Sequence, residues 1–124
     1  MYTLDTNAII YYLRDDSEAA PFLQSILDDP NILVYVSTIT EVELFGYPAL
    51  SDTEATTINS LLQTVSVIPL ESQIARAAGY IRRAYRLKTP DSVIAATALF
   101  TGSTLLTRNV RDFKKVPSLK LQAV

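Results

Sequence analysis

The chain has 124 residues, a length that predicts one domain spanning residues 1–124. Its hydrophobic fraction of 48% is enough for a core, and it contains neither cysteine nor histidine. Disulfides, zinc–thiolate sites, cysteine nucleophiles and catalytic triads that need histidine are therefore excluded. The formal net charge of −2 gives no support for nucleic-acid binding by the chain as a whole.

The start of the chain lacks the basic segment and apolar stretch of a secretory signal. No apolar run is long enough to span a membrane. We therefore expect a cytoplasmic protein with no membrane contact. The basic residues are unevenly distributed, because Arg14 stands alone in the first half and the other ten follow residue 75.

The predicted elements alternate between strands and helices along the chain. Apolar, β-branched runs predict strands at residues 2–5, 32–37, 65–68 and 104–107, with an edge strand at 119–122. Helical periodicity and capping residues predict helices at about 8–13, 17–27, 38–46, 53–63, 71–87 and 89–100. A short loop or helical turn is expected through Phe113. This alternation predicts an α/β fold with a parallel sheet.

Capping residues mark where several helices begin. Thr6 and Asn7 are candidate caps for the first helix, and Asp52 or Thr53 for the fourth. Proline at the favoured first position, Pro90, opens the last long helix.

Four acidic residues occupy positions where solvation alone is a poor explanation. Asp5 ends the first strand, and Glu43 is embedded in an apolar helix. Asp91 opens another apolar helix, and Asp112 follows the strand at 104–107. Elements of a parallel sheet bring such junctions to one edge, where like charges are costly unless cations neutralise them. Oxygen ligands suit hard cations, so the pattern predicts a site for Mg²⁺ or Mn²⁺.

Each acid also has an ordinary explanation when it is taken alone. Asp5 is a possible helix cap, and Asp91 suits the positive end of a helix dipole. Asp112 fits a turn, and Glu43 fits a solvated helix surface. Glu41 is the rival of Glu43, since residues two apart on a helix point in different directions.

Two sets of basic residues leave alternatives open. Arg108 and Arg111 are either solvated surface charges or clamps for phosphate groups beside the metal. The long helix carries Arg76, Arg82, Arg83 and Arg86, for which a solvated face is favoured over a track for an RNA backbone.

Four segments together resemble the PIN-domain ribonucleases. They are a strand followed by Asp5-Thr6-Asn7, the pattern Thr-x-x-Glu-Leu ending at Leu44, the pattern Pro-Asp-x-x-Ile-Ala-Ala starting at Pro90, and Leu-Thr-Arg-Asn-x-x-Asp-Phe ending at Phe113. The ordered set spans nearly the whole chain. A stand-alone domain of this size is most similar to VapC-type toxins of prokaryotic toxin–antitoxin pairs.

The resemblance implies a single-domain α/β/α sandwich with a mostly parallel sheet of four to five strands. It also implies an endoribonuclease that depends on Mg²⁺ or Mn²⁺, with Asp5, Glu43 and Asp91 as catalytic metal ligands. Asp112 is expected to complete the site together with Asn109, which stands where many family members have Asp. We expect the Thr6 hydroxyl to position water or phosphate.

The resemblance further implies three partners. They are an RNA substrate, a cognate VapB-like antitoxin that covers the acidic groove with an inserted arginine, and a second copy of the chain. Helices of the first half are expected to supply the apolar surface of that homodimer.

Two other functions stay open at this point. The departure at Asn109 would suit a catalytically degenerate binding module of the same fold. A metal-dependent nuclease or phosphatase acting on DNA or small phosphoesters is the second alternative, because no residue is seen to read a 2′-hydroxyl.

Overall fold

The computed structural model describes residues 1–124 and contains five strands and seven helices. The strands are β1 (Tyr2–Leu4), β2 (Val34–Ser37), β3 (Ser66–Ile68), β4 (Thr104–Thr107) and β5 (Leu121–Ala123). The helices are α1 (Thr6–Leu13), α2 (Ala19–Leu27), α3 (Thr38–Phe45), α4 (Asp52–Leu62), α5 (Ser72–Tyr85), α6 (Thr89–Thr101) and α7 (Val110–Phe113). The predicted strand–helix alternation is thereby confirmed.

The five strands form one sheet in the order β3-β2-β1-β4-β5, and every neighbouring pair is parallel. Strand β1 lies in the middle, where Tyr2 pairs with Val34 on one side and Leu4 pairs with Leu106 on the other. Leu4 and Leu106 are both fully buried, as expected for parallel strands covered on both faces.

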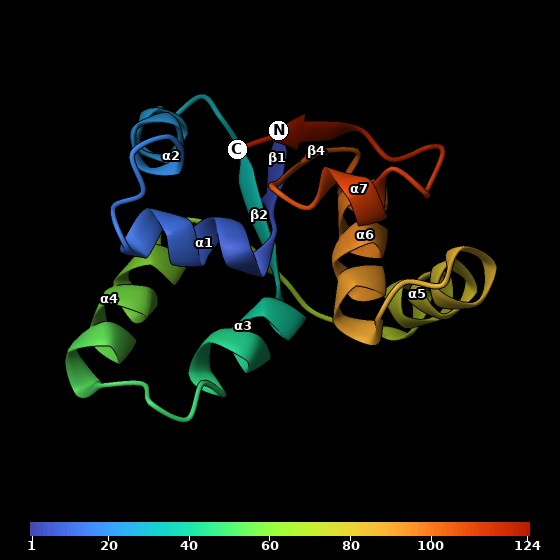
Figure 1. Cartoon of the computed structure of the whole chain (residues 1–124), viewed down its shortest axis with the longest axis horizontal. Coiled ribbons are helices and arrows are strands. Elements are labelled where there is room, and N and C mark those ends of the chain that lie inside the picture. The colour runs from blue at the N-terminus through green and yellow to red at the C-terminus, as the bar shows by residue number, and fades with distance from the viewer.

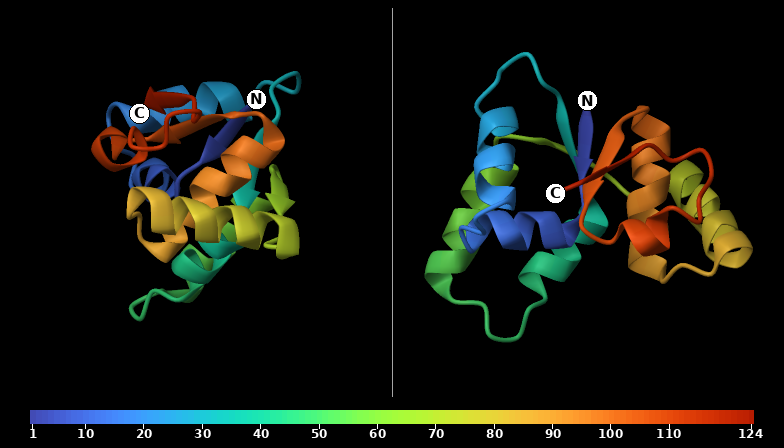
Figure 2. Two further views of the ribbon diagram at one scale, coloured as in Figure 1. Left: turned by 90° about the vertical axis from the view of Figure 1, so that its right-hand side faces the viewer. Right: turned by 45° about the horizontal axis from the view of Figure 1, so that its top comes forward.

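Helices cover both faces of this sheet (Figure 1, Figure 2). In Figure 1, α1, α2 and α4 lie to the left of the central strands, whereas α5, α6 and α7 lie to the right. Helix α3 lies below the sheet, where β2 ends. The predicted α/β/α sandwich is therefore confirmed, and the carboxyl ends of β1 and β2 open toward α3.

Each layer of helices packs on its own hydrophobic cluster. The first cluster joins α1, α2 and α4 to the sheet through residues such as Ile9, Leu23 and Leu61. The second joins α5, α6 and α7 through residues such as Ile81 and Phe113. Helix α6 is almost wholly buried from residue 92 to residue 98, so its first turn is fixed against the sheet edge.

Two helix caps differ from the sequence prediction. Asp5, not Thr6 or Asn7, occupies the N-cap position of α1, because the chain turns into the helix directly after β1. Helix α4 is capped by Ser51 rather than Asp52 or Thr53, through a reciprocal capping box with Glu54. Both helices begin one or two residues earlier than the capping preferences predicted.

None of the seven helices combines the length and the hydropathy that a membrane crossing requires.

Candidate functional site

Asp5 lies at the junction of β1 and α1, at the carboxyl edge of the sheet. Its side chain is only 3% exposed, and one carboxylate oxygen accepts a hydrogen bond of 2.8 Å from Thr107 Oγ1. Burial raises the pKa of Asp5, and the negative charge of Glu43 raises it further. The Thr107 hydroxyl and the backbone amides of Asn7 and Thr6 oppose this rise, so they favour the ionised carboxylate.

Asp91 lies in the first turn of α6, just after Pro90. Its carboxylate is half-buried, and its pKa is raised to about 6, first by burial and then by the charges of Asp5, Glu43 and Asp112. Lys88 lowers the pKa but does not offset these effects. The structure therefore brings acids from four separate segments within electrostatic reach of one another.

Glu43 projects toward this cluster from α3. Its Oε1 atom accepts a hydrogen bond of 2.7 Å from the Thr6 hydroxyl, whose oxygen also lies 3.0 Å from Thr40 Oγ1. Thr6 and Thr40 are both buried. Their contact joins the start of α1 to α3, and the Thr6 hydroxyl orients Glu43. Glu41 is not among the charges that raise the pKa of Asp91, which separates it from Glu43.

Asp112 and Asn109 form a pair beyond the end of β4. Asn109 Nδ2 donates a hydrogen bond of 3.0 Å to Asp112 Oδ2, and Lys115 Nζ lies 3.9 Å from Asp112 Oδ1. Asp112 thus has two partners of its own, unlike Asp91. Its charge nevertheless reaches Asp91 and raises the pKa there.

Thr107 has a larger part in the site than its sequence position indicated. It is fully buried at the end of β4, donates to Asp5 and accepts a hydrogen bond of 2.9 Å from the backbone N–H of Asn109. This one hydroxyl therefore connects the β1 and β4 sides of the site. The sequence feature that could have indicated this role is that Thr107 is a polar residue at the end of an otherwise apolar strand, at the sheet edge where Asp5 lies.

The donor chemistry of the cluster fits a hard divalent cation. Every candidate ligand is a carboxylate, amide or hydroxyl oxygen, as Mg²⁺ and Mn²⁺ prefer. No three acidic side chains are drawn together into a ready-made metal site. A bound cation would offset the mutual repulsion of these carboxylates.

Arg108 does not serve as a phosphate clamp in this structure. Its Nη2 atom lies 2.8 Å from Asp16 Oδ2, its Nε donates to the Val124 backbone carbonyl at 2.8 Å, and its guanidinium stacks 4.1 Å from the centroid of the Tyr11 ring. These contacts fix the loop before α2 and the end of the chain. These contacts favour a structural role for Arg108 over the phosphate clamp, while Arg111 remains exposed.

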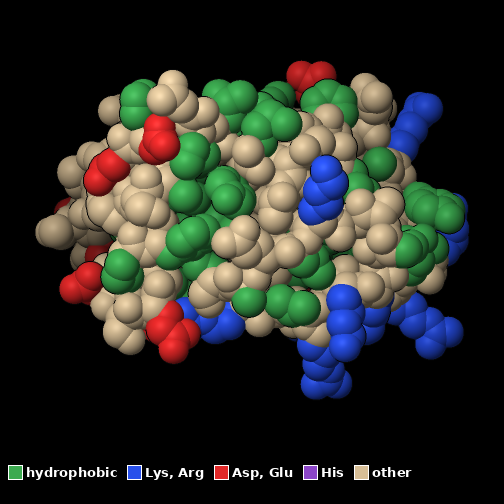
Figure 3. Space-filling view, turned by 90° about the horizontal axis from the view of Figure 1, so that it is seen from above, with side chains coloured by type: hydrophobic (Ala, Val, Ile, Leu, Met, Phe, Trp, Pro, Cys, Tyr) green, Lys and Arg blue, Asp and Glu red, His purple; other side chains and the backbone are tan.

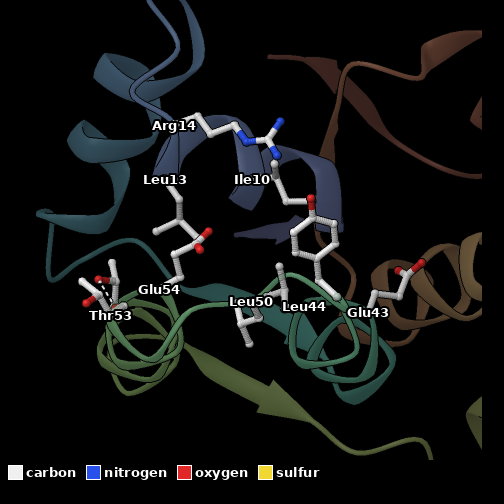
Figure 4. Close-up of a pocket in the computed structure, with 10 residues that line it drawn as sticks. Ile10, Leu13, Arg14, Glu43, Leu44, Leu50, Thr53 and Glu54 are labelled. Atoms are coloured by element: carbon white, nitrogen blue, oxygen red, sulfur yellow. Dashed lines mark hydrogen bonds between the residues drawn. The ribbon is translucent and has the colours of Figure 1, made fainter.

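A groove of about 230 Å³ lies beside the acids, between α1, α3 and α4. Figure 4 shows Ile10 and Leu13 of α1 facing Leu44 and Leu50 across it. Glu43 forms part of its lining, so the groove borders the acidic site. A surface that combines apolar walls with a carboxylate is suited to a polypeptide segment that carries both apolar and basic side chains.

Similarity to known proteins agrees with this geometry. The PIN domain family model matches residues 2–119. Ribonuclease VapC19 of Mycobacterium tuberculosis is 28% identical over 125 residues, which cover 97% of this chain and 98% of that protein.

Solved structures share the fold. A toxin–antitoxin complex from Klebsiella pneumoniae contains a chain with a TM-score of 0.79 and 29% identity, covering 96% of this chain and 95% of that one. VapBC2 from Rickettsia felis, bound to a promoter DNA fragment, gives a TM-score of 0.82 over 99% of this chain and 98% of that one, and at 22% identity it bears on the fold alone. Since the family model spans nearly all of the sequence, the chain belongs to the PIN-domain family.

Proposed function

We propose that this chain is a metal-dependent endoribonuclease that hydrolyses RNA phosphodiesters, and that it is the toxin of a toxin–antitoxin pair. The match of the PIN domain family model to residues 2–119 carries the proposal. The geometry agrees with it, because the half-buried Asp91 carboxylate lies near acids from three other segments, whose charges help to raise its pKa to about 6. The similarity to a ribonuclease over almost the full length of both chains supports RNA as the substrate.

In this proposal, Asp5, Glu43 and Asp91 hold the first Mg²⁺ or Mn²⁺ ion. Asp112 and Asn109 hold a second ion or orient the attacking water. When bound, the metal polarises water and offsets the negative charge that develops on the phosphate. The protein supplies one buried carboxylate, Asp5, and the more exposed carboxylates of Glu43, Asp91 and Asp112 beside it.

Two hydroxyl groups keep two of these carboxylates in position. Thr107 donates to Asp5 and Thr6 donates to Glu43, while Thr40 Oγ1 lies beside the Thr6 hydroxyl. We assign Thr6 and Thr107 as positioning residues, because the Thr6 hydroxyl is already engaged with Glu43 and the Thr107 hydroxyl with Asp5. This support from surrounding hydrogen bonds is typical of ligands around metal sites.

The partner in this proposal is a VapB-like antitoxin that lies in the groove between α1, α3 and α4. Its apolar side chains would contact Ile10, Leu13 and Leu44, and an inserted arginine would reach Glu43. The Klebsiella pneumoniae structure, which is a toxin–antitoxin complex, supports a partner of this kind.

We further propose that the chain forms a homodimer through α3. Val42 is 65% exposed and Phe45 is 41% exposed, although both are large apolar residues on this short helix. Light scattering after size exclusion should give twice the chain mass, and Val42→Asp should shift it toward the monomer. A strict monomer for the wild type at high concentration would contradict the dimer.

The nuclease is tested by incubating purified protein with total tRNA and ribosomal RNA in Mg²⁺, Mn²⁺ or EDTA. We expect discrete cuts with either metal, none in EDTA, and a loss of about 100-fold or more in Asp5→Asn. Asp28→Asn, at the exposed end of α2, is the matched control and should cleave like the wild type.

A folded Asp5→Asn protein that cleaves normally would refute the role of Asp5. If folded wild-type protein made no cuts and released no heat on titration with Mn²⁺, the catalytically degenerate binding module would replace the nuclease. Preferential cleavage of DNA or small phosphoesters would favour the other alternative.

A further inference from the structure

Helix α5 and the turn after it carry an unusual concentration of positive charge. Between residues 71 and 88 there are five basic residues and a single acid, Glu71, in a chain whose net charge is −2. Neither of the two ion pairs of the structure involves α5. In Figure 3, Lys and Arg side chains gather on the right of the molecule, the side that α5, α6 and α7 occupy in Figure 1.

Part of this charge surrounds a shallow hollow, which we call the α5 hollow. It is lined by Gly79, Arg82, Arg83, Arg86 and Leu87, so no acid contributes to it. Arg82 Nη1 donates a hydrogen bond of 3.2 Å to the Leu87 carbonyl, which holds this arginine at the rim. Gly79 faces open space at the hollow, because a Cβ atom added there would meet nothing within 4 Å.

An exposed aromatic ring accompanies the arginines of the α5 hollow. Tyr80 is 56% exposed, and the Arg83 guanidinium lies 5.8 Å from the centroid of its ring. Tyr85 makes an edge-to-face contact with Tyr80, with a centroid distance of 6.4 Å. Arginines beside an exposed aromatic ring are the combination with which proteins bind single-stranded nucleic acids.

The α5 hollow is continuous in the chain with the acidic site. Leu87 and Lys88 join the end of α5 to the first turn of α6, and Lys88 is close enough to lower the pKa of Asp91. The Ser92 hydroxyl donates a hydrogen bond of 2.9 Å to the Lys88 carbonyl and ties this junction together. A strand whose scissile phosphate lies at the acids would therefore have its flanking phosphates beside α5.

We infer that the α5 hollow binds phosphate groups of the single-stranded RNA that flanks the scissile bond, with Tyr80 as a stacking surface for a base. The inference rests on the proposed function, which supplies RNA as the polynucleotide. The guanidinium groups of Arg83 and Arg86 contact phosphates, while Arg82 lines the wall. Acidic protein segments share the negative charge but offer no base to stack on Tyr80.

The first test measures RNA binding without cleavage. A fluorescein-labelled 20-nucleotide RNA of mixed sequence is titrated with protein in EDTA, and anisotropy is recorded at several salt concentrations. The double variant Arg83→Gln/Arg86→Gln should bind about tenfold more weakly at low salt. Its slope of log affinity against log salt should fall by about 1.4, since each lost contact to a single strand removes about 0.7. Arg76→Gln/Lys120→Gln removes the same charge outside the α5 hollow and should bind like the wild type.

The second test adds charge without removing any side chain. Gly79→Glu places a carboxylate in the α5 hollow, and Gly79→Gln places a neutral group of the same size there. Weaker RNA binding by Gly79→Glu than by Gly79→Gln, with equal thermal unfolding, is the expected result. Equal affinities for this pair, or equal losses in the two double variants, would overturn the inference.

Two further measurements distinguish RNA binding from binding of an acidic protein and from binding of DNA. Weaker binding of labelled poly-glutamate, with RNA binding unchanged, would assign the α5 hollow to an acidic protein and overturn the RNA assignment. Tighter wild-type binding to a DNA strand of the same sequence would also overturn it. Because binding is measured in EDTA, a wild type that binds RNA through α5 but never cleaves it would refute the nuclease and leave the α5 hollow standing.

Discussion

Asp16 and Asp91 are the same residue type in opposite electrostatic surroundings. Asp16 accepts hydrogen bonds from Arg108 Nη2 at 2.8 Å and from the Ala19 backbone N–H at 2.9 Å. The Arg108 guanidinium holds the pKa of Asp16 well below its usual range. Asp91 has its pKa raised to about 6, first by burial and then by three neighbouring acids.

The two shifts have opposite consequences for folding. A lowered pKa means that ionised Asp16 stabilises the fold above its ordinary pKa, and this contribution is lost as the pH falls toward the folded value. A raised pKa means that the folded state binds a proton at Asp91 more tightly than the unfolded state does. Stability is therefore lost as the pH rises from about 4 to about 6. A carboxylate that lowers the folding stability in this way is a candidate functional group.

The largest expected effect comes from removing the charge of Asp91. Asp91→Asn should reduce RNA cleavage by about 100-fold or more, because the amide is a poor ligand and the cluster loses a negative charge. Asp16→Asn should cleave like the wild type. Initial rates of RNA cutting in Mn²⁺, measured on both folded variants, check this contrast. Equal losses of cleavage rate in Asp91→Asn and Asp16→Asn would contradict the assignment of Asp91, and not Asp16, to the catalytic site.

The same Asp91→Asn substitution should stabilise the fold at neutral pH. Relief of repulsion is expected to raise the free energy of unfolding by about 1–2 kcal/mol, after allowance for solvent screening and for the lost helix-dipole interaction. Near pH 4 the gain should vanish, because Asp91 is then protonated in the wild type. Urea unfolding at pH 4 and pH 7.5 without metal provides the measurement. A variant less stable than the wild type at both pH values would contradict the raised pKa.

A smaller effect on activity is expected at Thr6, which positions Glu43. Thr6→Val keeps the shape of the buried side chain but removes the hydrogen bond of 2.7 Å to Glu43. Cleavage should fall by about tenfold, as is common when a group that orients a metal ligand is lost. Thr6→Ser keeps the hydroxyl and should restore most of the activity. If Thr6→Ser cleaved RNA no faster than Thr6→Val, Thr6 would contribute through packing and not by orienting Glu43.

The smallest expected effect concerns the paired region. Arg108→Gln should lower the thermal midpoint slightly, because exposed ion pairs contribute little, and should leave the cleavage rate unchanged. The midpoint difference from the wild type should shrink toward pH 2, because the stabilising contribution of ionised Asp16 is lost progressively as the pH falls below the ordinary pKa of an aspartate. Thermal unfolding followed by circular dichroism at pH 7 and pH 2 tests this. A lost cleavage activity in folded Arg108→Gln would return Arg108 to the phosphate-binding residues.

The elements that the sequence predicted well are those set by local patterns. Val34–Ser37 and Thr104–Thr107 are apolar, β-branched runs, and burial on both faces follows from their composition. The acids at Asp5 and Asp91 were predicted to converge because strand ends and helix starts of a parallel sheet share one edge. The structure places both there.

The features that the sequence did not predict depend on residues far apart in the chain. Arg108 was left open as a phosphate clamp because Asp16, its partner, is 92 residues away. The hydrogen bond from Thr107 to Asp5 was not predicted for the same reason, since Asp5 lies 102 residues before it. Capping preferences also failed at α4, because Asp52 and Ser51 are both favoured caps and only the backbone geometry selects Ser51.

The direct test of the central claim is an NMR titration of Asp91 with and without Mg²⁺. The carboxyl carbon of Asp91 should titrate with a pKa near 6 in EDTA, and saturating Mg²⁺ should lower this pKa well below 4, because a bound cation reverses the repulsion within the cluster. Asp16 should keep its low pKa in both conditions. An Asp91 pKa that stays near 6 in saturating Mg²⁺ would contradict the assignment of these acids to a metal site.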